Sequence, residues 1–575
     1  MYEPAPPRPK KTDIVRSRNG CQSCRKRRTK ELPWIPLTPM TKCDEKKPVC
    51  GTCVRLGIVC ESVKLDLKFR VVTAPPPKKT GAKAEPAEPD STRLGLQLFG
   101  QHSRSPQIPN INLAQSLQHT DRDVFYSTYW EDHCLPALHP IFRCASELLG
   151  FPALKDAILA LSSCNISRIY AERKYSTSFP TTGTLSPNLI HQTRSQLYYS
   201  SAIKKFISLT QDDHRNNAAE VLTILVLFGY IEASMGNFDG YYCHVQGLSA
   251  FLVELRETTG YSLYRALLIS WLQSQFLIWW ARTYFSSLDV QRNMPSIDFP
   301  RGLEGTSDSF HDLRVVVLSI LCESHRLNVK ETLKHWRDKT DFEPALASVL
   351  QSDRDDTEDR FARLQDESKR LDEWLSYLPP SEQPLVGDAS ETSPIFFQAH
   401  DAALNFAYYV VARIMQCISF LRNLPCRDAQ HLGSECLEIE PWARLLLRIV
   451  QGTDMQTSII RNNYTIGFSG LLLAASLRCQ DLSLSMQIEK WLQTLEEKQP
   501  TEEGAFPVYQ ALAVVKAINR QRTMGRDVFG VSQTMDDGGG MPKFTHYNSQ
   551  MITNILVHGK CRSTGDLFTE CIDLQ

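Results

Sequence analysis

The sequence CQSCRKRRTK, residues 21–30, is followed after a gap by CDEKKPVCGTCVRLGIVC, residues 43–60. These two stretches contain six cysteines, Cys21, Cys24, Cys43, Cys50, Cys53 and Cys60. Two C-x2-C pairs, each followed by a further cysteine, are a strong signature of a metal site. Zinc takes four thiolates in a tetrahedron, so six cysteines can satisfy two Zn²⁺ ions when two thiolates are shared. The pattern therefore predicts a small module that holds two zinc ions.

The charge of the chain is uneven, although its formal net charge is zero. Residues 1–84 hold 20 Lys/Arg and 7 Asp/Glu, a surplus of 13 positive charges that the rest of the chain balances. A basic N-terminal segment followed by an acidic remainder indicates that the N-terminal segment binds a polyanion. The N-terminus has no apolar signal region, and no apolar run is long enough to span a membrane. In a chain kept out of the secretory pathway, clustered cysteines favour metal over disulfides.

Composition divides the chain into five parts. Residues 1–15 are predicted to be a disordered basic arm, 16–65 the zinc module, 66–118 a disordered linker, 119–560 a large helical domain and 561–575 a C-terminal tail. The predicted fold class is mainly α, with the domain 119–560 all-α. The eleven cysteines outside the module are scattered, and Cys164, Cys322 and Cys417 are expected to be buried apolar residues.

Helical periodicity carries the prediction for residues 119–560. One helix face is expected from apolar residues that recur every three or four positions: Leu404, Ala407, Tyr408, Val411, Met415, Ile418 and Leu421. The run 221–228 is apolar on all sides and predicts a buried helix. The turn-rich stretch 234–240 would join it to a second helix with Tyr241, Val245, Leu248, Phe251 and Leu255 on one face. Residues 173–190 and 536–542 are expected to be loops, and 352–374 is a densely charged break.

A basic run follows the first cysteine pair directly. Because zinc would fix the start of this run, its cations would be presented to a partner in a defined direction. Lys and Arg bind guanine edges in the major groove as well as phosphates. The run could instead be only a nuclear-import signal or a solvated charge run, although such a run would not need the cysteines. The candidate DNA-binding residues are Arg16, Arg18, Arg25, Lys26, Arg27, Arg28, Lys30, Lys42, Lys46 and Lys47, with Arg55 a further candidate phosphate contact.

These stretches resemble the fungal binuclear zinc-cluster (Zn2Cys6) family. The resemblance implies that one zinc ion is held by Cys21, Cys24, Cys43 and Cys50, and the other by Cys50, Cys53, Cys60 and Cys21, so that Cys21 and Cys50 bridge. Short helices would begin near Cys24 and Cys53, and Pro48 matches the family's loop proline. By resemblance, residues around Arg27 to Lys30 would reach bases, in CGG-type triplets, while Arg16, Arg18, Lys46 and Lys47 would contact phosphates.

One interval departs from the family's pattern. Eighteen residues separate Cys24 from Cys43, where the family has six. The excess of twelve can be placed at 31–42, or equally well at 29–40, because a Thr-Lys pair stands at both positions. A gene-model artefact of 36 coding nucleotides and a genuine loop both remain open, since lengthening a loop costs little. If the insertion is real, Lys42 could take the place of Lys30, and the base contacts are in doubt.

The helical part resembles the fungal-specific transcription factor regulatory domain. The stretches that carry the resemblance are 123–138, 196–209, 222–252 and 400–417. Family members use this domain to sense effectors and to contact transcription partners, but the sequence identifies no effector. His244 is expected to be a packing residue of the helical hairpin, and Trp271, Trp279 and Trp280 are expected in the core rather than in a ligand cage. The acidic stretch 353–359 is expected to be a solvated loop or helix face.

The leading interpretation is a nuclear, sequence-specific regulator of RNA polymerase II transcription that binds double-stranded DNA. A second copy of the chain and transcription co-regulators are candidate protein partners, and the oligomeric state is left open. The alternative is a regulator whose zinc cluster is disabled by the insertion and that acts through partners of the helical domain. No enzyme is expected: GFSGL at 467–471 lacks the last glycine of G-x-S-x-G, and no P-loop or H-E-x-x-H occurs.

Overall fold

The computed structural model describes Cys53 and, with gaps, residues 113–574. The gaps are 144–150, 176–182, 236–239, 246, 249–260, 285, 298, 300–309, 337–346, 386–392, 425–428, 499–501, 505 and 534–553. The chain divides into two units, Met1–Pro106 and Gln107–Gln575. Only Cys53 is described in the first unit, so the elements that follow all belong to the second.

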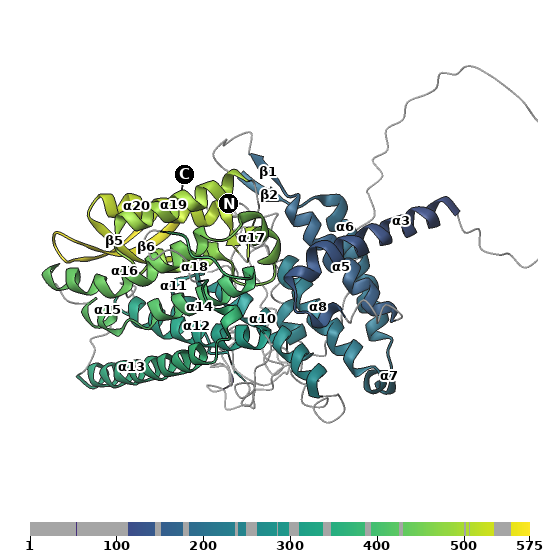
Figure 1. The fold of residues 1–575 in the computed structure, drawn as a ribbon, viewed down its shortest axis with the longest axis horizontal. Helices are drawn as coiled ribbons and strands as arrows, with labels where there is room; N and C mark the ends of the chain where they lie inside the picture. The colour runs from purple at the N-terminus through teal and green to yellow at the C-terminus, as the bar shows by residue number, and fades with distance from the viewer. Residues whose placement is uncertain are drawn as a thin grey trace, which may run out of the picture. The chain divides into compact units, whose positions relative to one another are not determined.

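Helices dominate the second unit, and the prediction of a mainly α fold is confirmed (Figure 1). Besides α-helices and strands, the unit contains a π-helical turn, Trp130–Cys134, and two short 3-10 turns, Leu135–Ala137 and Pro380–Glu382. The helices are α3 (Leu113–Tyr129), α5 (Pro152–Ile169), α6 (Leu189–Ile207), α7 (Gln211–Asn216), α8 (Ala218–Met235), α10 (Tyr261–Tyr284), α11 (Leu288–Arg292), α12 (Phe310–Leu333), α13 (Ala347–Ser376), α14 (His400–Met415), α15 (Ile418–Asn423), α16 (Ala429–Gln451), α17 (Met455–Arg461), α18 (Phe468–Ser476), α19 (Leu482–Glu497) and α20 (Val508–Thr523). The strands are β1 (Glu172–Tyr175), β2 (Gly183–Ser186), β3 (Glu502–Glu503), β4 (Phe506–Pro507), β5 (Arg526–Ser532), β6 (Asn554–Cys561) and β7 (Leu567–Asp573).

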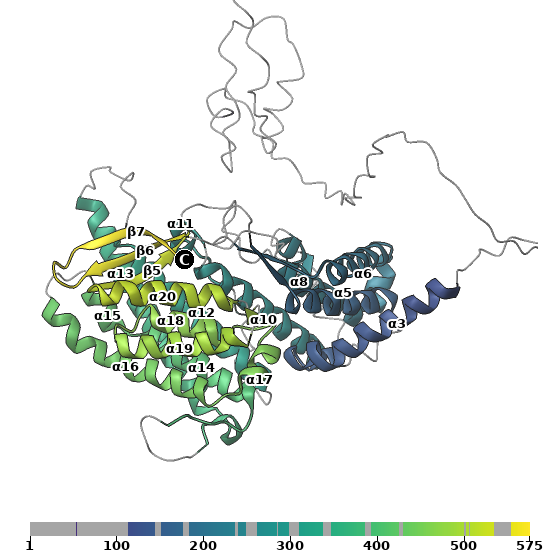
Figure 2. The same ribbon diagram turned by 90° about the horizontal axis from the view of Figure 1, so that it is seen from above.

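One apolar core runs through the helices of this unit. Helices α3, α5, α6 and α8 gather at one end, and α12, α14, α16 and α18 gather at the other, as two views show (Figures 1 and 2). The predicted buried helix at 221–228 lies inside α8, which is buried on most of its surface. The tyrosine ring of Tyr241 packs against Gly229 of α8, where a Cβ would lie 3.6 Å from it. The predicted packing of the hairpin is therefore confirmed at this pair.

A three-stranded antiparallel sheet, in the order β5-β6-β7, closes the C-terminal part of the chain. β5 lies against α20, and the indole nitrogen of Trp336 donates to the carbonyl oxygens of Gly559 and Phe568 at 3.2 and 2.9 Å. The prediction of an all-α domain with a C-terminal tail at 561–575 is wrong in this region. Residues 567–573 form β7, because their backbone pairs along the whole of β6.

Other predicted boundaries also change. The linker predicted over 66–118 overlaps α3, which begins at Leu113, and residues 66–112 lie outside the described part. The loop predicted at 173–190 contains the hairpin β1–β2 and the start of α6. The charged stretch 352–374 lies within the single long helix α13. A helix can contain this many charged residues because the described part of α13 exposes one face to solvent and buries the other.

Within the described part of the chain, two segments, Ala218–Met235 and His400–Arg422, are long and apolar enough to cross a membrane by length and composition. The share of each apolar window that is buried inside the protein is 67% and 78%. The second segment is also interrupted between α14 and α15. Both segments therefore belong to the apolar core described above.

His558, in the middle strand of the sheet, makes the fold sensitive to acid. It is 1% exposed, and its ring nitrogens lie 2.8 Å from Ser532 Oγ and 3.1 Å from Thr569 Oγ1. Burial, with a smaller contribution from the charge of Arg292, lowers the pKa of His558 to about 4. The unfolded chain takes up this proton near pH 6.5 whereas the folded chain does not, so stability falls as the pH drops from 7 to 5.

We expect His558→Gln to reduce this loss of unfolding free energy between pH 7 and pH 5 by about 2 kcal/mol, because glutamine does not titrate. Urea unfolding at the two pH values measures the difference. Thr193→Ala, at an exposed position on α6, replaces a side chain that does not titrate in this range and is the control; it should leave the pH dependence as in the unsubstituted chain. An unchanged pH dependence in His558→Gln would show that this histidine does not cause the acid sensitivity.

Candidate nucleic-acid module and an internal cavity

The residues predicted to bind zinc and DNA lie almost entirely outside the described part of the chain. Cys53 is the exception: it is helical, fully buried and not in a disulfide. Its neighbours lie outside the described residues, so the short helix expected near Cys53 stays a prediction. The zinc ligands outside the described residues are Cys21, Cys24, Cys43, Cys50 and Cys60, and so are the candidate DNA contacts Arg16, Arg18, Arg25, Lys26, Arg27, Arg28, Lys30, Lys42, Lys46 and Lys47.

The described cysteines of the second unit behave differently from the cluster. Cys164 and Cys322 are buried, as predicted, and Cys417 is half-buried. Burial raises the pKa of Cys164 to about 11 and that of Cys417 to about 12, so both thiols stay protonated near neutral pH. Among the described residues, no group of three or more His, Cys, Asp and Glu side chains could hold a metal ion. The two Zn²⁺ ions therefore remain a prediction that rests on residues 21–60.

A cavity in the second unit lies among α5, α8, α10 and the segments around Tyr464 and Glu502. Its empty volume is about 450 Å³, part of which is open to solvent. Arg168, at the end of α5, forms an ion pair with Glu502 at the start of β3 in the cavity wall. Because both side chains are largely buried, this pair places opposite charges in a poorly hydrated setting, where each stabilises the other.

Most of the remaining cavity wall is apolar or aromatic, with aliphatic surface from Ala233, Leu277, Ile278 and Ala281, and Ser234 and Asn463 also line it. Two tyrosines in the wall meet edge to face with ring centroids 5.5 Å apart: Tyr230 and Tyr464. The Tyr230 hydroxyl donates to the Ser270 carbonyl oxygen at 3.1 Å, and burial raises the pKa of both phenols. The cavity is thus lined by a largely apolar wall, two uncharged polar residues and one charged pair.

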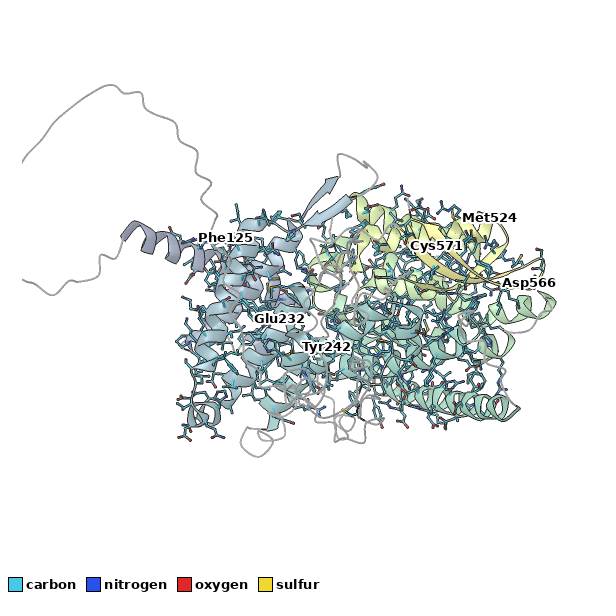
Figure 3. The ribbon with its side chains drawn as sticks, turned by 180° about the vertical axis from the view of Figure 1, so that it is seen from behind. Phe125, Glu232, Tyr242, Met524, Asp566 and Cys571 are labelled. Carbon is cyan, nitrogen blue, oxygen red and sulfur yellow. The ribbon has the colours of Figure 1, made fainter. Side chains whose placement is uncertain are left out.

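His244 takes part in a buried hydrogen-bond chain between helices. The Tyr199 hydroxyl donates to Glu232 at 2.6 Å and lies 2.7 Å from His244 Nε2. The His244 ring also packs on Phe228, and Glu232 lies within the helices in Figure 3. Burial and the neighbouring Glu232 carboxylate raise the pKa of Tyr199, so the phenol keeps its proton. The prediction of a packing role for His244 is confirmed.

The three tryptophans also have the predicted role in the core. Trp280 is fully buried and Trp279 is 5% exposed, with its indole nitrogen donating to the Pro295 carbonyl oxygen at 2.8 Å. Trp271 packs on the same core. Sequence reasoning missed the cavity residues Arg168 and Glu502, because 334 positions separate them and neither belongs to a recognisable pattern.

The chain is similar to a curated protein, Sterol uptake control protein 2 of Candida albicans. The two are 37% identical over 159 residues, which cover 26% of this chain and 18% of that protein. The match thus spans less than a fifth of the relative's length. No protein-family model matches the chain, and no solved structure matches it. The name of the relative ties that protein to the control of sterol uptake.

Proposed function

We propose that this chain is a DNA-binding regulator of RNA polymerase II transcription that acts in the nucleus. The observation that carries the proposal is the pattern of six cysteines with four consecutive basic residues, 25–28, directly behind Cys24. Metal-fixed cations suit a polyanion that must be read in one orientation. The similarity to a fungal protein named for the control of sterol uptake supports a control function.

In this proposal, two Zn²⁺ ions hold the module together, with Cys21 and Cys50 shared between them. Arg27 and its neighbours contact guanine O6 and N7 in CGG-type triplets, since Arg and Lys pair with this edge in the major groove. Arg16, Arg18, Lys46 and Lys47 contact phosphates and set the register of the module on the duplex.

Two measurements on the full chain test the proposal. Zinc analysis should give two ions per chain, and selection from a random DNA library should enrich sites that contain CGG. Removal of zinc with a chelator should abolish the selective binding, because structural zinc supplies much of the folding energy of such modules. A chain that holds two zinc ions but enriches no sequence would contradict sequence-specific recognition.

Arg27→Ala should weaken binding to the selected site by about 1–3 kcal/mol if Arg27 contacts a base. Binding to unrelated DNA should change much less, so the ratio of specific to non-specific affinity is the readout. The matched control is Lys79→Ala, in the predicted linker, which should leave both affinities close to those of the unsubstituted chain. An equal loss on both kinds of DNA would assign Arg27 to a phosphate.

The interval of eighteen residues between Cys24 and Cys43 favours a second candidate function. If the insertion prevents the two zinc ions from sharing ligands, the chain would regulate through partners of the helical unit without contacting DNA. Sequencing the transcript across codons 28–44 separates the two. A message that lacks 36 nucleotides removes the reason for the second candidate, whereas a message that contains them, together with a chain that binds no zinc, supports it.

A further inference from the structure

The segment 393–397, with the sequence SPIFF, lies against the C-terminal end of α16 without forming a helix or a strand. Its first residue, Ser393, is half-buried, and Pro394 is exposed. A residue before proline is held in an extended conformation, because the proline ring disfavours the helical region for it. Proline also has no backbone N–H to offer. An extended serine followed by proline is the kind of substrate that proline-directed protein kinases accept.

Three kinds of contact hold this segment in place. The backbone nitrogen of Ile395 donates to the Arg448 carbonyl oxygen at 3.0 Å. A Cβ at Gly452 would collide with the Ile395 carbonyl oxygen, so the two backbones approach each other closely at a residue without a side chain. Ile395 and Phe397 pack on the core, whereas Phe396 between them is 56% exposed. The segment is therefore fixed on α16 with part of its length at the surface.

A guanidinium group lies directly at the backbone of Ser393. Arg448 Nε donates to the Ser393 carbonyl oxygen at 2.7 Å. Only the carbonyl carbon, Cα and Cβ separate this oxygen from Ser393 Oγ along the chain, so a group attached to the hydroxyl lies within reach of the guanidinium. Arg448 stands in the last turn of α16, where a cation offsets the negative end of the helix dipole. A phosphate at Ser393 would thus meet a cation at this helix end.

The chain contains four Ser-Pro or Thr-Pro pairs, which begin at Thr38, Ser105, Ser186 and Ser393. The first two lie outside the described residues. Ser186 ends β2, where its backbone pairs with Glu172 of β1, and Pro187 after it is buried. Ser393 belongs to no strand, and the proline after it is exposed. Of the two described pairs, the one at Ser393 is therefore the better substrate for an enzyme that binds an extended segment.

We propose that Ser393 is a phosphorylation site for a proline-directed serine/threonine protein kinase and that Arg448 binds the phosphate. The Ser393 hydroxyl oxygen forms a bond to the γ-phosphorus of ATP, the bond from this phosphorus to the β–γ bridging oxygen breaks, and ADP leaves. The hydroxyl proton passes to the catalytic base of the kinase. The phosphate carries about −1.5 to −2 charges near pH 7 and has three strong acceptor oxygens.

The phosphate changes the contacts of Arg448. A charge-assisted hydrogen bond is stronger than one to a neutral carbonyl oxygen, so the guanidinium turns from the Ser393 carbonyl oxygen to the phosphate. The new ion pair fastens segment 393–397 to α16, which packs on α14 and α18 in the helical unit. The modification therefore acts on this unit and does not depend on DNA recognition by residues 16–65.

Treatment of the full chain with a mitogen-activated protein kinase and ATP, followed by mass spectrometry of its peptides, tests the site. Phosphate should appear on Ser393, and Ser393→Ala should remove this signal. Ser186→Ala is the matched control and should leave phosphorylation of Ser393 as in the unsubstituted chain. Phosphate on Thr38 or Ser105 without phosphate on Ser393 would overturn the proposal. So would a chain without any phosphate while a control peptide in the same reaction is phosphorylated.

The rate of dephosphorylation tests the contact with Arg448. A phosphate held by the guanidinium is withheld from a phosphatase, so Arg448→Ala should speed the release of phosphate from Ser393 by about 10-fold or more. Arg448→Lys keeps the charge and should give an intermediate rate. Arg444→Ala, one turn earlier on α16 where the arginine pairs with Glu440, is the control and should leave the rate unchanged. Equal rates in all of these chains would show that Arg448 does not bind the phosphate.

Discussion

Cys50→Ser is expected to abolish both zinc binding and sequence-specific DNA binding by the full chain. In the proposed cluster, Cys50 is one of two thiolates that contact both metal ions, so its loss removes a ligand from each. Binding of structural zinc is worth about 10–16 kcal/mol, more than a module of some fifty residues could replace with packing. Zinc content per chain and affinity for the selected DNA site are the two measurements.

Two comparisons make this experiment specific. Cys243→Ser replaces an exposed thiol outside the cluster and should leave zinc content and DNA affinity unchanged. Cys60→Ser removes a ligand that belongs to one zinc ion only, so its effect on metal content should be smaller than that of Cys50→Ser. A Cys50→Ser chain that keeps two zinc ions and its DNA affinity would show that Cys50 does not bridge.

Periodicity predicted the interior helices well because their neighbours bury them. Leu404, Ala407, Tyr408 and Met415 are all fully buried in α14, as their spacing indicated. The same periodicity concealed a break, since Leu421 is also buried but belongs to α15. α14 ends at Met415, and the dipeptide Gln416-Cys417 that follows lacks the glycine or proline that would have marked a boundary. Buried residues continue on both sides of the break. Because periodicity reflects only which residues are buried, it could not predict the break.

The sheet was harder to predict. β5 and β6 are separated by residues 533–553, so their pairing is not a local hairpin with a short turn signal. β6 also contains His558 and Lys560, which are buried polar residues and weaken an alternating pattern. These two side chains are tolerated because partners satisfy them: Lys560 donates to the Leu424 carbonyl oxygen at 3.3 Å, and His558 contacts two hydroxyls. Such partners cannot be read from the strand itself.

The segment GFSGL, residues 467–471, fits no sequence motif, and a tertiary contact explains its structure. Gly467 precedes α18, which has no capping side chain of its own. The carboxylate of Glu503 on β3 performs that role, because its oxygens accept from the backbone nitrogens of Phe468 at 2.9 Å and Ser469 at 2.7 Å. Asn462 Nδ2 donates to the same carboxylate at 2.5 Å.

Two glycines let this carboxylate approach the helix. A Cβ at Gly467 would lie 2.4 Å from a Glu503 oxygen, and a Cβ at Gly504 would lie 2.3 Å from the Gly467 nitrogen. Gly504 also has a positive φ of 66°, which favours glycine. Ser469 is fully buried at the start of α18, so the resemblance of this segment to a catalytic serine motif has no counterpart in an accessible hydroxyl.

Glu503→Ala is expected to lower the free energy of unfolding of the helical unit by about 4 kcal/mol. The substitution leaves two backbone donors and the Asn462 amide unsatisfied in the interior, and each such group costs about 1–3 kcal/mol. Burial raises the pKa of Glu503, so the native site already bears a desolvation cost and the net loss stays below the sum of three full penalties. Glu503→Gln keeps one acceptor oxygen and should lose about half as much, which distinguishes the cap from simple packing.

Urea unfolding at pH 7, followed by circular dichroism, measures both variants, with Glu497→Ala at the exposed end of α19 as the control. If Glu503→Ala unfolded at the same urea concentration as the control, the N-terminus of α18 would not depend on this carboxylate.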